Sequence, residues 1–460
     1  MIISLSLFIA FFLPWIIGYE LLSLILRRQK FNPVLMVSLS YGLGFGFLAY
    51  LMFVLSFFKL ALTLCNVQAG LISSLAILLA IRVIDKKKEK NEAVIFEKKE
   101  SLFGNASLLL KIIIALGILY VLYNVALILL RALIVPVCSW DSLATCVYNA
   151  KLIFYEKTIP PLKFLPHPSY PLGIPLMITW LNLNLGYFDE YYLNLISVFL
   201  FITFLCVFYY FLGYFTNKRW ALLGVVLLIS SNLIYFHAGI FYRDLPIMYY
   251  CCCALFLLVL WAEQANKGVA LLSSTLIGIS SFIKMEGSGY SIIFILLSAI
   301  LINKTKQGWP GIRKNIFLFV FPALILNSVF YVVKFMQKVQ ATEHYDLSFN
   351  LLIHRIPHIL EVFFFGVFFS ANWNIFWFLF LVSILVRFRN KGKNVSIRVL
   401  ILNTSLWIFI LFVWALFSEK GGSALISPYT FSRVLIHYFP LIIALIILLL
   451  YPSAEAKEVK

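Results

Sequence analysis

Residues 191–262 read YYLNLISVFLFITFLCVFYYFLGYF-TNKR-WALLGVVLLISSNLIYFHAGI-FYRD-LPIMYYCCCALFLLVLWA, with hyphens marking two short polar turns. The three apolar stretches between the turns contain no Asp, Glu, Lys or Arg. Their lengths are close to the roughly 20 apolar residues that a helix needs to cross a hydrocarbon core about 30 Å thick. The pattern predicts three helices that cross a membrane in alternating directions.

The same pattern extends over the rest of the chain. Of its 460 residues 63% are hydrophobic and 12% are charged, whereas a soluble domain carries about 45–50% and about 25%. We therefore expect an all-α, polytopic transmembrane protein with no large soluble domain. The thirteen spans that we expect lie at about 2–25, 34–57, 60–83, 107–135, 191–215, 220–240, 245–262, 269–284, 290–302, 315–335, 372–386, 399–417 and 438–450.

The basic residues indicate how these spans are oriented. The net charge is +18, and Lys and Arg gather in short segments between the spans, at 27–28, 85–100, 218–219, 304–314 and 387–398. Such clusters are typical of cytoplasmic loops, so we do not expect nucleic acid as a partner. With this orientation the N-terminus lies outside and the C-terminus in the cytoplasm.

The segment 168–187 decides whether this orientation is consistent. If it crossed the membrane, Lys218 and Arg219 would move outside and every later loop would invert. Prolines at 160, 161, 166, 168, 171 and 175 also disfavour a straight span. We therefore expect a juxtamembrane or re-entrant element on the outer face, within a long outer loop at 138–188.

The beginning of this outer loop has the periodicity of an amphipathic helix lying on the bilayer surface, over 140–156. Its expected apolar face consists of Trp140, Leu143, Ala144, Val147 and Phe154. Cys138 and Cys146 lie in the same loop, where a disulfide is an option, although a helix after Trp140 disfavours it.

Ionisable residues at the membrane boundary are costly, so each is a candidate for function. Those at the expected outer face are Asp141, Arg243, Asp244, Lys284, Glu286, Arg433 and His437. Each also has a structural reading. Asp141 can complement a helix N-terminus, Arg243 and Asp244 can pair or cap a helix, Lys284 can snorkel, and Arg433 with His437 can anchor the chain at the interface.

The order of the motifs around these residues resembles a known family. Along the chain come Trp140-Asp141, HPSYPLGIPL at 167–176, RDLP at 243–246, SFIKMEG at 281–287 and SRVLIHYFPL at 432–441. Over roughly residues 107–450 this is similar to the GT-C superfamily of membrane glycosyltransferases, which use polyprenyl-phosphate sugars. The closest likeness is to the bacterial branch that contains relatives of protein O-mannosyltransferases and the aminoarabinose transferase of lipid A.

The resemblance implies a GT-C fold with juxtamembrane helices in the first large outer loop, in a bacterial inner (plasma) membrane. Residues 1–106 would be additional N-terminal transmembrane helices, 107–450 the catalytic membrane domain and 451–460 a cytoplasmic tail. Asp141 matches the aspartate that acts as catalytic base in that family. The residues expected to bind substrate are Asp244, Arg243, Lys284, Glu286, Arg433, His167 and His437.

The implied activity is an inverting transfer of a sugar from a polyprenyl-phosphate donor to a glycan, lipid or protein acceptor. No cofactor is certain; a divalent metal ion is an option, although Arg243-Asp244 replaces the pair of acids seen in many members. Four spans precede Asp141, where family members often have one. Two alternatives remain open: a transporter or flippase for lipid-linked sugars, and an O-antigen polymerase or ligase type of enzyme. The latter would use His344, His354, Arg355 and His358 in the 336–371 loop.

Overall fold

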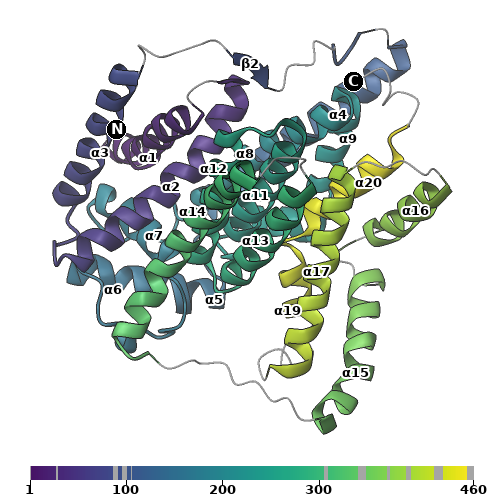
Figure 1. Ribbon diagram of the computed structural model, residues 1–460. Coiled ribbons are helices and arrows are strands. Elements are labelled where there is room, and N and C mark those ends of the chain that lie inside the picture. The colour runs from purple at the N-terminus through teal and green to yellow at the C-terminus, as the bar shows by residue number, and fades with distance from the viewer. Residues whose placement is uncertain are drawn as a thin grey trace. The chain divides into compact units, whose positions relative to one another are not determined.

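The computed structural model shows an almost entirely helical chain (Figure 1). It describes residues 2–26, 29–85, 92–95, 101–104, 106–304, 309–339, 349–369, 373, 375–389, 395–418 and 428–452. Within these residues eight helices are long and apolar enough to cross a membrane, and a pair bent by 78°, at 218–229 and 232–238, would make a ninth. The protein is therefore an integral membrane protein made of apolar helices, as the composition predicts.

Each of the thirteen expected spans coincides with a helix or, in one case, with the bent pair. Four of the helices are apolar but short: α12 (Lys267–Ile283), α13 (Glu286–Lys304), α16 (Phe376–Arg389) and α20 (Phe439–Leu450). A helix of 12–19 residues falls below the roughly 20 residues of a full crossing. The positions of the predicted helices are confirmed, and the count of thirteen crossings stays a prediction.

The helices form two compact units, each built from separate parts of the chain. The first unit comprises 1–98, 127–207 and 238–339. Its elements are α1 (Ile2–Ile25), β1 (Gln29–Phe31), α2 (Pro33–Phe57), α3 (Leu64–Asp85), β2 (Glu92–Ile95), α5 (Trp140–Ser142), the π-helix η2 (Leu143–Val147), α6 (Tyr148–Glu156), the 3₁₀ turn η3 (Leu162–Phe164), α7 (Gly173–Leu185), α11 (Asp244–Gln264), α12, α13 and α14 (Trp309–Met336). The short strands β1 and β2 pair in parallel, which the sequence had not predicted.

The second unit comprises 99–126, 208–237 and 340–460. Its elements are α9 (Lys218–Ile229), α10 (Asn232–Ala238), α15 (Phe349–Phe364), the π-helix η4 (Phe365–Phe369), α16, α17 (Val395–Phe417), α19 (Pro428–Leu435) and α20. Helix α20 packs on α9, α16 and α17. Helices α4 (Leu108–Ile134) and α8 (Asn194–Phe215) each contribute residues to both units, so the boundary expected at residue 106 remains untested.

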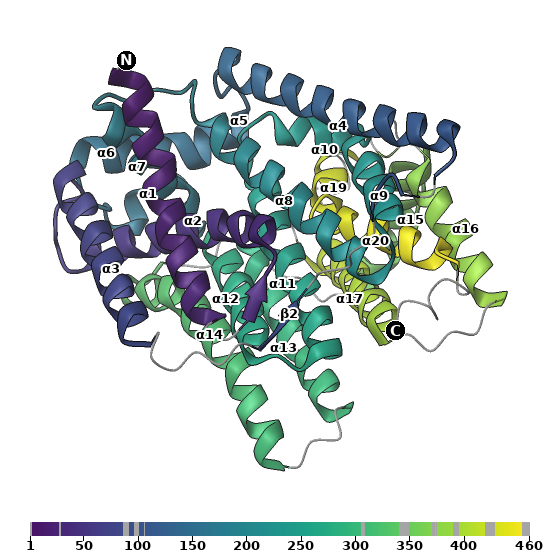
Figure 2. The same cartoon turned by 90° about the horizontal axis from the view of Figure 1, so that it is seen from above.

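Glycines bring the first two helices of the first unit into backbone contact. A methyl group at Gly18 would collide with the Ser40 carbonyl, and one at Gly44 with the Pro14 carbonyl. Close approach through small residues is the usual way in which helices pack inside a bilayer, where burial of apolar surface gives little driving force. Helices α1 and α2 therefore form a rigid pair against which α7 packs (Figure 2).

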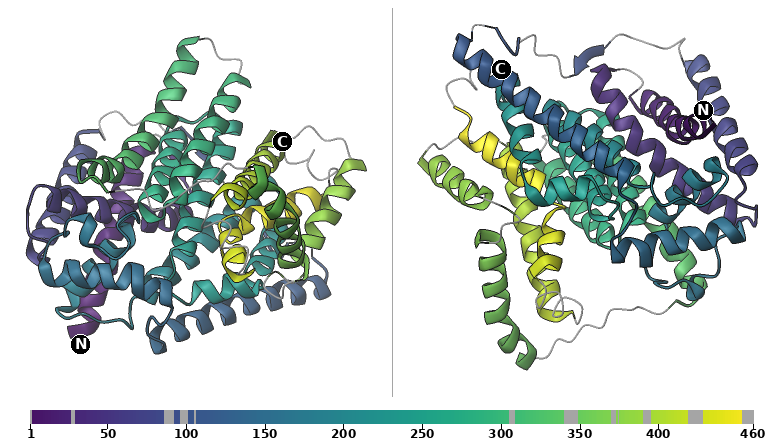
Figure 3. Two further views of the ribbon diagram at one scale, coloured as in Figure 1. Left: turned by 90° about the horizontal axis from the view of Figure 1, so that it is seen from below. Right: turned by 180° about the vertical axis from the view of Figure 1, so that it is seen from behind.

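Helix α11 lies at the centre of the packing. Nearly all of its residues are buried, whereas most of α3 and α4 is not. It packs on α12, which in turn contacts α13 and α14, as the neighbouring green helices of Figure 3 show. The hydroxyls of Tyr249 and Tyr250 also donate to carbonyls of α2, at Ser38 and Gly42. An enclosed helix of this kind fixes the position of whatever side chains lie at its ends.

The long segment between α4 and α8 is helical where expected, and one face of its helix is buried in the protein. The buried residues of 140–156 are Ser142, Cys146, Val147, Asn149, Ala150 and Ile153. Of the apolar face predicted to lie on the bilayer, Val147 is buried in the protein, whereas Trp140 is 80% exposed, so its contact with the bilayer stays a prediction. The π-helical turn η2 inserts an extra residue into the helical repeat within this segment.

Helix α7 forms most of the segment 168–187, on which the predicted orientation depends. Its 13 residues span about 20 Å at 1.5 Å per residue, too short for a crossing. Hydrogen bonds join the surrounding loop to the ends of α2, α3 and α14: Leu62 N donates to Lys157 O, Ile159 N to Ser56 Oγ and Leu162 N to Gln337 Oε1. The predicted orientation assigns all three of these helix ends to the outer side. It assigns the loop to the same side, so the hydrogen bonds and the predicted orientation agree.

Candidate functional site

The candidate site begins at the N-terminus of the enclosed helix α11. Asp244 is the first residue of this helix and is completely buried. The unpaired N–H groups of a helix N-terminus favour a carboxylate, which explains why an acidic residue can occupy this position. The side chain is thus fixed at the end of an almost completely buried helix.

Lys284 comes from the joint between α12 and α13. Helix α12 ends at Ile283, Lys284 has extended backbone angles of φ −149° and ψ 151°, and α13 starts at Glu286. A cation is favoured at a helix C-terminus and an anion at an N-terminus, so Lys284 and Glu286 both suit their places. The first residue of α7, Gly173, lies directly against the Phe282 carbonyl, where a methyl group would collide.

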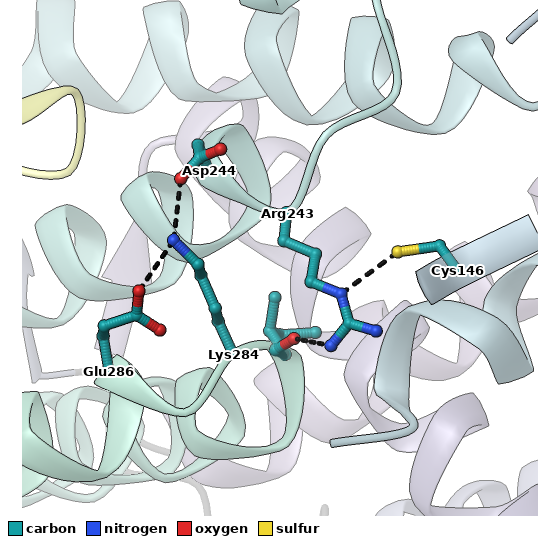
Figure 4. A network of polar contacts seen from close by, with 6 residues as sticks. Cys146, Arg243, Asp244, Lys284 and Glu286 are labelled. Carbon is teal, nitrogen blue, oxygen red and sulfur yellow. Dashed lines mark hydrogen bonds and ion pairs between the residues drawn. The ribbon is translucent and has the colours of Figure 1, made fainter. Parts of the chain in front are cut away.

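These elements bring three charged side chains together (Figure 4). The Lys284 Nζ atom lies 2.9 Å from Asp244 Oδ1 and 2.8 Å from Glu286 Oε1. The side chains are 9% exposed for Lys284, 0% for Asp244 and 36% for Glu286. Two carboxylates therefore share one ammonium group, and Glu286 is the member that reaches the surface.

The side chain of Arg243 turns away from Asp244 and bonds other groups, instead of forming the ion pair with Asp244 that the sequence allowed. Its Nε donates to Cys146 Sγ at 3.1 Å and its Nη1 to the carbonyls of Pro171 at 3.0 Å and Ile283 at 3.3 Å. Its Nη2 donates to the Thr145 carbonyl at 3.3 Å. The residue is only 5% exposed. The guanidinium thus joins three segments that are far apart in the sequence.

Asp141 lies at the first turn of α5, on the segment that Arg243 holds. The Ser142 hydroxyl donates to the Phe241 carbonyl, and Thr145 Oγ1 donates to the Asp141 carbonyl at 2.6 Å. The segment that carries the half-buried Asp141 is therefore docked on the turn that precedes Asp244. Cys146 in the same segment and Cys138 before it are both free thiols, so the disulfide that remained an option is not formed.

Tyr170 is a site residue that the sequence reasoning did not single out. Its ring stacks on the Arg243 guanidinium, with the central carbon 5.0 Å from the ring centroid. Burial raises the pKa of the Tyr170 hydroxyl, and the Glu286 carboxylate raises it further. Asp141 also raises this pKa, whereas the cations Lys284 and Arg243 lower it. The pKa of Tyr170 is therefore affected by the charges of all four of these predicted residues, and its hydroxyl stays protonated and neutral.

A signal for Tyr170 was present in the sequence, since it belongs to HPSYPLGIPL. The histidine of that motif, His167, is exposed, and its ring centroid lies 5.6 Å from that of Tyr170. The structure thus puts the exposed His167 beside Tyr170, whose ring in turn lies on the Arg243 guanidinium.

Arg433 and His437 belong to the second unit. Arg433 is half-buried in the last turn of α19, and His437 is completely buried in the turn that follows. Asp141, His167, Arg243, Asp244, Lys284 and Glu286 all belong to the first unit. Whether Arg433 and His437 join them stays a prediction.

A divalent metal was an option for this site. Among the residues that the structure describes, no three Cys, His, Asp or Glu side chains form a group that could hold a metal ion. At the cluster itself the Lys284 ammonium already lies within ion-pair distance of both carboxylates. The metal requirement stays a prediction, and the mechanism proposed below uses none.

The chain matches no known family model, no curated protein and no solved structure. The GT-C likeness therefore depends on the order of its motifs.

Proposed function

We propose that the protein is an inverting glycosyltransferase that moves a sugar from a polyprenyl-phosphate donor to an acceptor at the outer face of the membrane. The observation that carries this proposal is the Lys284 ammonium between Asp244 and Glu286, next to the turn on which the Asp141 segment is docked. The cluster combines two carboxylates and a fixed cation at helix ends with the neutral hydroxyl of Tyr170 in the loop before α7.

In the proposed reaction, an acceptor hydroxyl attacks the anomeric carbon of the donor sugar. The new bond joins the acceptor oxygen to that carbon, while the bond from the carbon to the phosphate oxygen breaks. The Asp141 carboxylate takes the proton of the hydroxyl as the attack proceeds. The products are the glycosylated acceptor, with inverted configuration, and polyprenyl phosphate.

The leaving phosphate changes from a monoanionic diester to a monoester that carries about two negative charges near neutral pH. Stabilising this developing charge needs a cation that is already oriented. Lys284 is the predicted cation of the first unit: Asp244 and Glu286 fix its ammonium at 2.9 Å and 2.8 Å, and their two charges offset its own until the acceptor or a proton reaches the exposed Glu286. Arg433 is the predicted second cation. Glu286, the exposed acid, is the group best placed to receive the acceptor.

A transporter or flippase for lipid-linked sugars is the first alternative. Such a protein binds its substrate near the middle of the bilayer, often at interrupted helices. Here Asp244 and Glu286 are the first residues of their helices, and Lys284 directly follows the last residue of α12. In the predicted orientation these helix ends belong to the outer side, where they suit chemistry at the membrane boundary better than a path through it.

The polymerase or ligase type of enzyme is the second alternative. Its candidate arginine, Arg355 in α15, has its Nη1 within 3.3 Å, 3.1 Å and 2.8 Å of the carbonyls of Ala415, Leu416 and Ser418. These are carbonyls at the end of α17, so the guanidinium caps that helix. His354 and His358 are exposed, and His344 lies outside the described residues. This cap favours a structural role for Arg355.

The proposal is tested with purified protein in liposomes that contain polyprenyl-phosphate pentoses or hexoses, by measuring polyprenyl phosphate release. Because a positioned base contributes about 10²–10⁴-fold, Asp141→Asn should lower turnover by about that factor. The matched control is Asp189→Asn, in the same segment between α4 and α8, where the remaining amide oxygen can still accept the Tyr191 N–H bond. Equal turnover of Asp141→Asn and wild type would refute the proposal. Movement of intact donor across the bilayer without phosphate release would favour a flippase.

A further inference from the structure

We propose that Arg243 is a positioning residue rather than a ligand for the substrate phosphate. It holds the segment of Asp141 and the loop of Tyr170 against the joint that carries Lys284. The catalytic consequence of this role rests on the function proposed above, whereas the role itself does not.

The hydrogen bonds of the guanidinium leave little capacity for a substrate. An arginine side chain has five N–H donors in one plane. Four bonds to Cys146, Thr145, Pro171 and Ile283 engage Nε, Nη1 and Nη2. One face of the plane is covered by the Tyr170 ring. A phosphate would have to displace bonds that the folded chain already makes.

The bonded carbonyls lie next to the residues that the mechanism uses. Pro171 follows Tyr170, and Ile283 precedes Lys284. Thr145 lies one helical turn after Asp141, within the π-helical turn η2. Single π-helical turns are frequent at functional sites, where they change the direction of side chains. One planar group therefore sets the relative positions of the base, the hydroxyl and the cation.

A lysine at position 243 separates the two roles. It keeps the positive charge but replaces the planar fork by a single ammonium group, which cannot make the same set of bonds. A misplacement of about 1 Å can cost about 10²-fold in rate. Arg243→Lys should therefore lower kcat by about that factor and leave KM for the donor within about twofold. A phosphate ligand would behave in the opposite way, with a raised KM and partial rescue by lysine.

A second measurement is independent of any enzymatic activity. Cys146 is 2% exposed and lies against the guanidinium. In a background with Cys65, Cys138 and Cys206 replaced by alanine, Cys146 of the wild type should react slowly with a membrane-impermeant maleimide. Arg243→Lys should raise the labelling rate at least tenfold, as read by mass spectrometry of the Cys146 peptide. Arg219→Lys is the matched control, because Arg219 also bonds backbone carbonyls but in the second unit.

The outcomes separate this inference from the proposed function. Faster Cys146 labelling in a folded Arg243→Lys protein supports the positioning role even if the wild type transfers no sugar. Unchanged labelling together with a raised donor KM would overturn it. If the lysine variant does not fold, Arg243→Gln, which retains an amide donor, is measured in the same way.

Discussion

In the described part of the first unit, the ion pair of Glu20 and the cluster at Lys284 each contain a buried carboxylate, and they differ in the number of acids at the cation. Between α1 and α3, Arg82 Nη1 lies 2.7 Å and 2.9 Å from the two carboxylate oxygens of Glu20. At the candidate site, Asp244 and Glu286 share the single ammonium of Lys284. The first cluster pairs one charge with one, and its arginine is 40% exposed. The second has an excess of acid around a cation that is 9% exposed.

The difference distinguishes a structural pair from a functional candidate. At the first cluster the arginine is 40% exposed, so solvent reaches the ion pair and screens its charges. At the second cluster two carboxylates meet a cation that is 9% exposed, and charges held away from solvent in this way are costly to keep buried. We therefore expect the two clusters to respond differently to the loss of their cations.

The largest difference should follow the removal of each cation. Lys284→Met leaves Asp244 buried without its ammonium partner, which should destabilise the protein by about 3–5 kcal/mol. Arg82→Met leaves Glu20, whose side chain is 9% exposed, without its cation, but the arginine that it replaces is 40% exposed, so solvent can reach the site and the loss should be smaller, about 1–3 kcal/mol. Reversible unfolding in mixed detergent micelles measures both. If both variants lost a similar amount of unfolding free energy, the difference between the two clusters would not affect stability.

A smaller effect is expected from the exposed acid of the unbalanced cluster. Glu286→Gln keeps the shape of the side chain and leaves Lys284 paired with Asp244. The change in the free energy of unfolding should be within about 1 kcal/mol because the carboxylate is 36% exposed. Turnover in the liposome assay should fall about tenfold if Glu286 receives the acceptor. Full activity of Glu286→Gln would remove Glu286 from the site.

The smallest effect should come from the hydroxyl of Tyr170. Tyr170→Phe keeps the ring that stacks on Arg243 and removes only the oxygen. One hydrogen bond is worth about 0.5–1.5 kcal/mol, so turnover should fall by about 2- to 10-fold. Tyr187→Phe, at an exposed tyrosine of the same outer segment, is the control and should be neutral. If both variants kept full activity, the tyrosine would only pack against the arginine.

The membrane helices could be predicted from the sequence because apolar length is a local property. Helix α15 was not predicted, since it is interrupted by His354, Arg355 and Pro357 and reads as a polar loop. The pairing of β1 with β2 depends on residues about sixty positions apart, which no local pattern records.

The sequence indicated which residues belong to the candidate site better than it indicated which contacts they make. Lys284, Asp244 and Glu286 stood out because charged residues next to spans are rare. The direction of the Arg243 side chain could not be predicted, because it depends on carbonyls at Thr145, Pro171 and Ile283 that only the folded chain brings together. The π-helical turn η2 within 140–156 could not be predicted either, because a regular helical period does not include it.

The joint between α12 and α13 has a consequence for how the chain can vary in length. Only Lys284 and Met285 separate the two helices, and the backbone of Gly287 lies against that of Ser280. Adding one residue within the first turn of α13, directly after Glu286, would rotate Glu286 by about 100° relative to the rest of the helix, carrying it away from its partner. A substitution at this joint changes the contacts of one side chain, whereas an insertion or deletion shifts every side chain that follows it in α13. Changes of length here should therefore be more damaging than most substitutions.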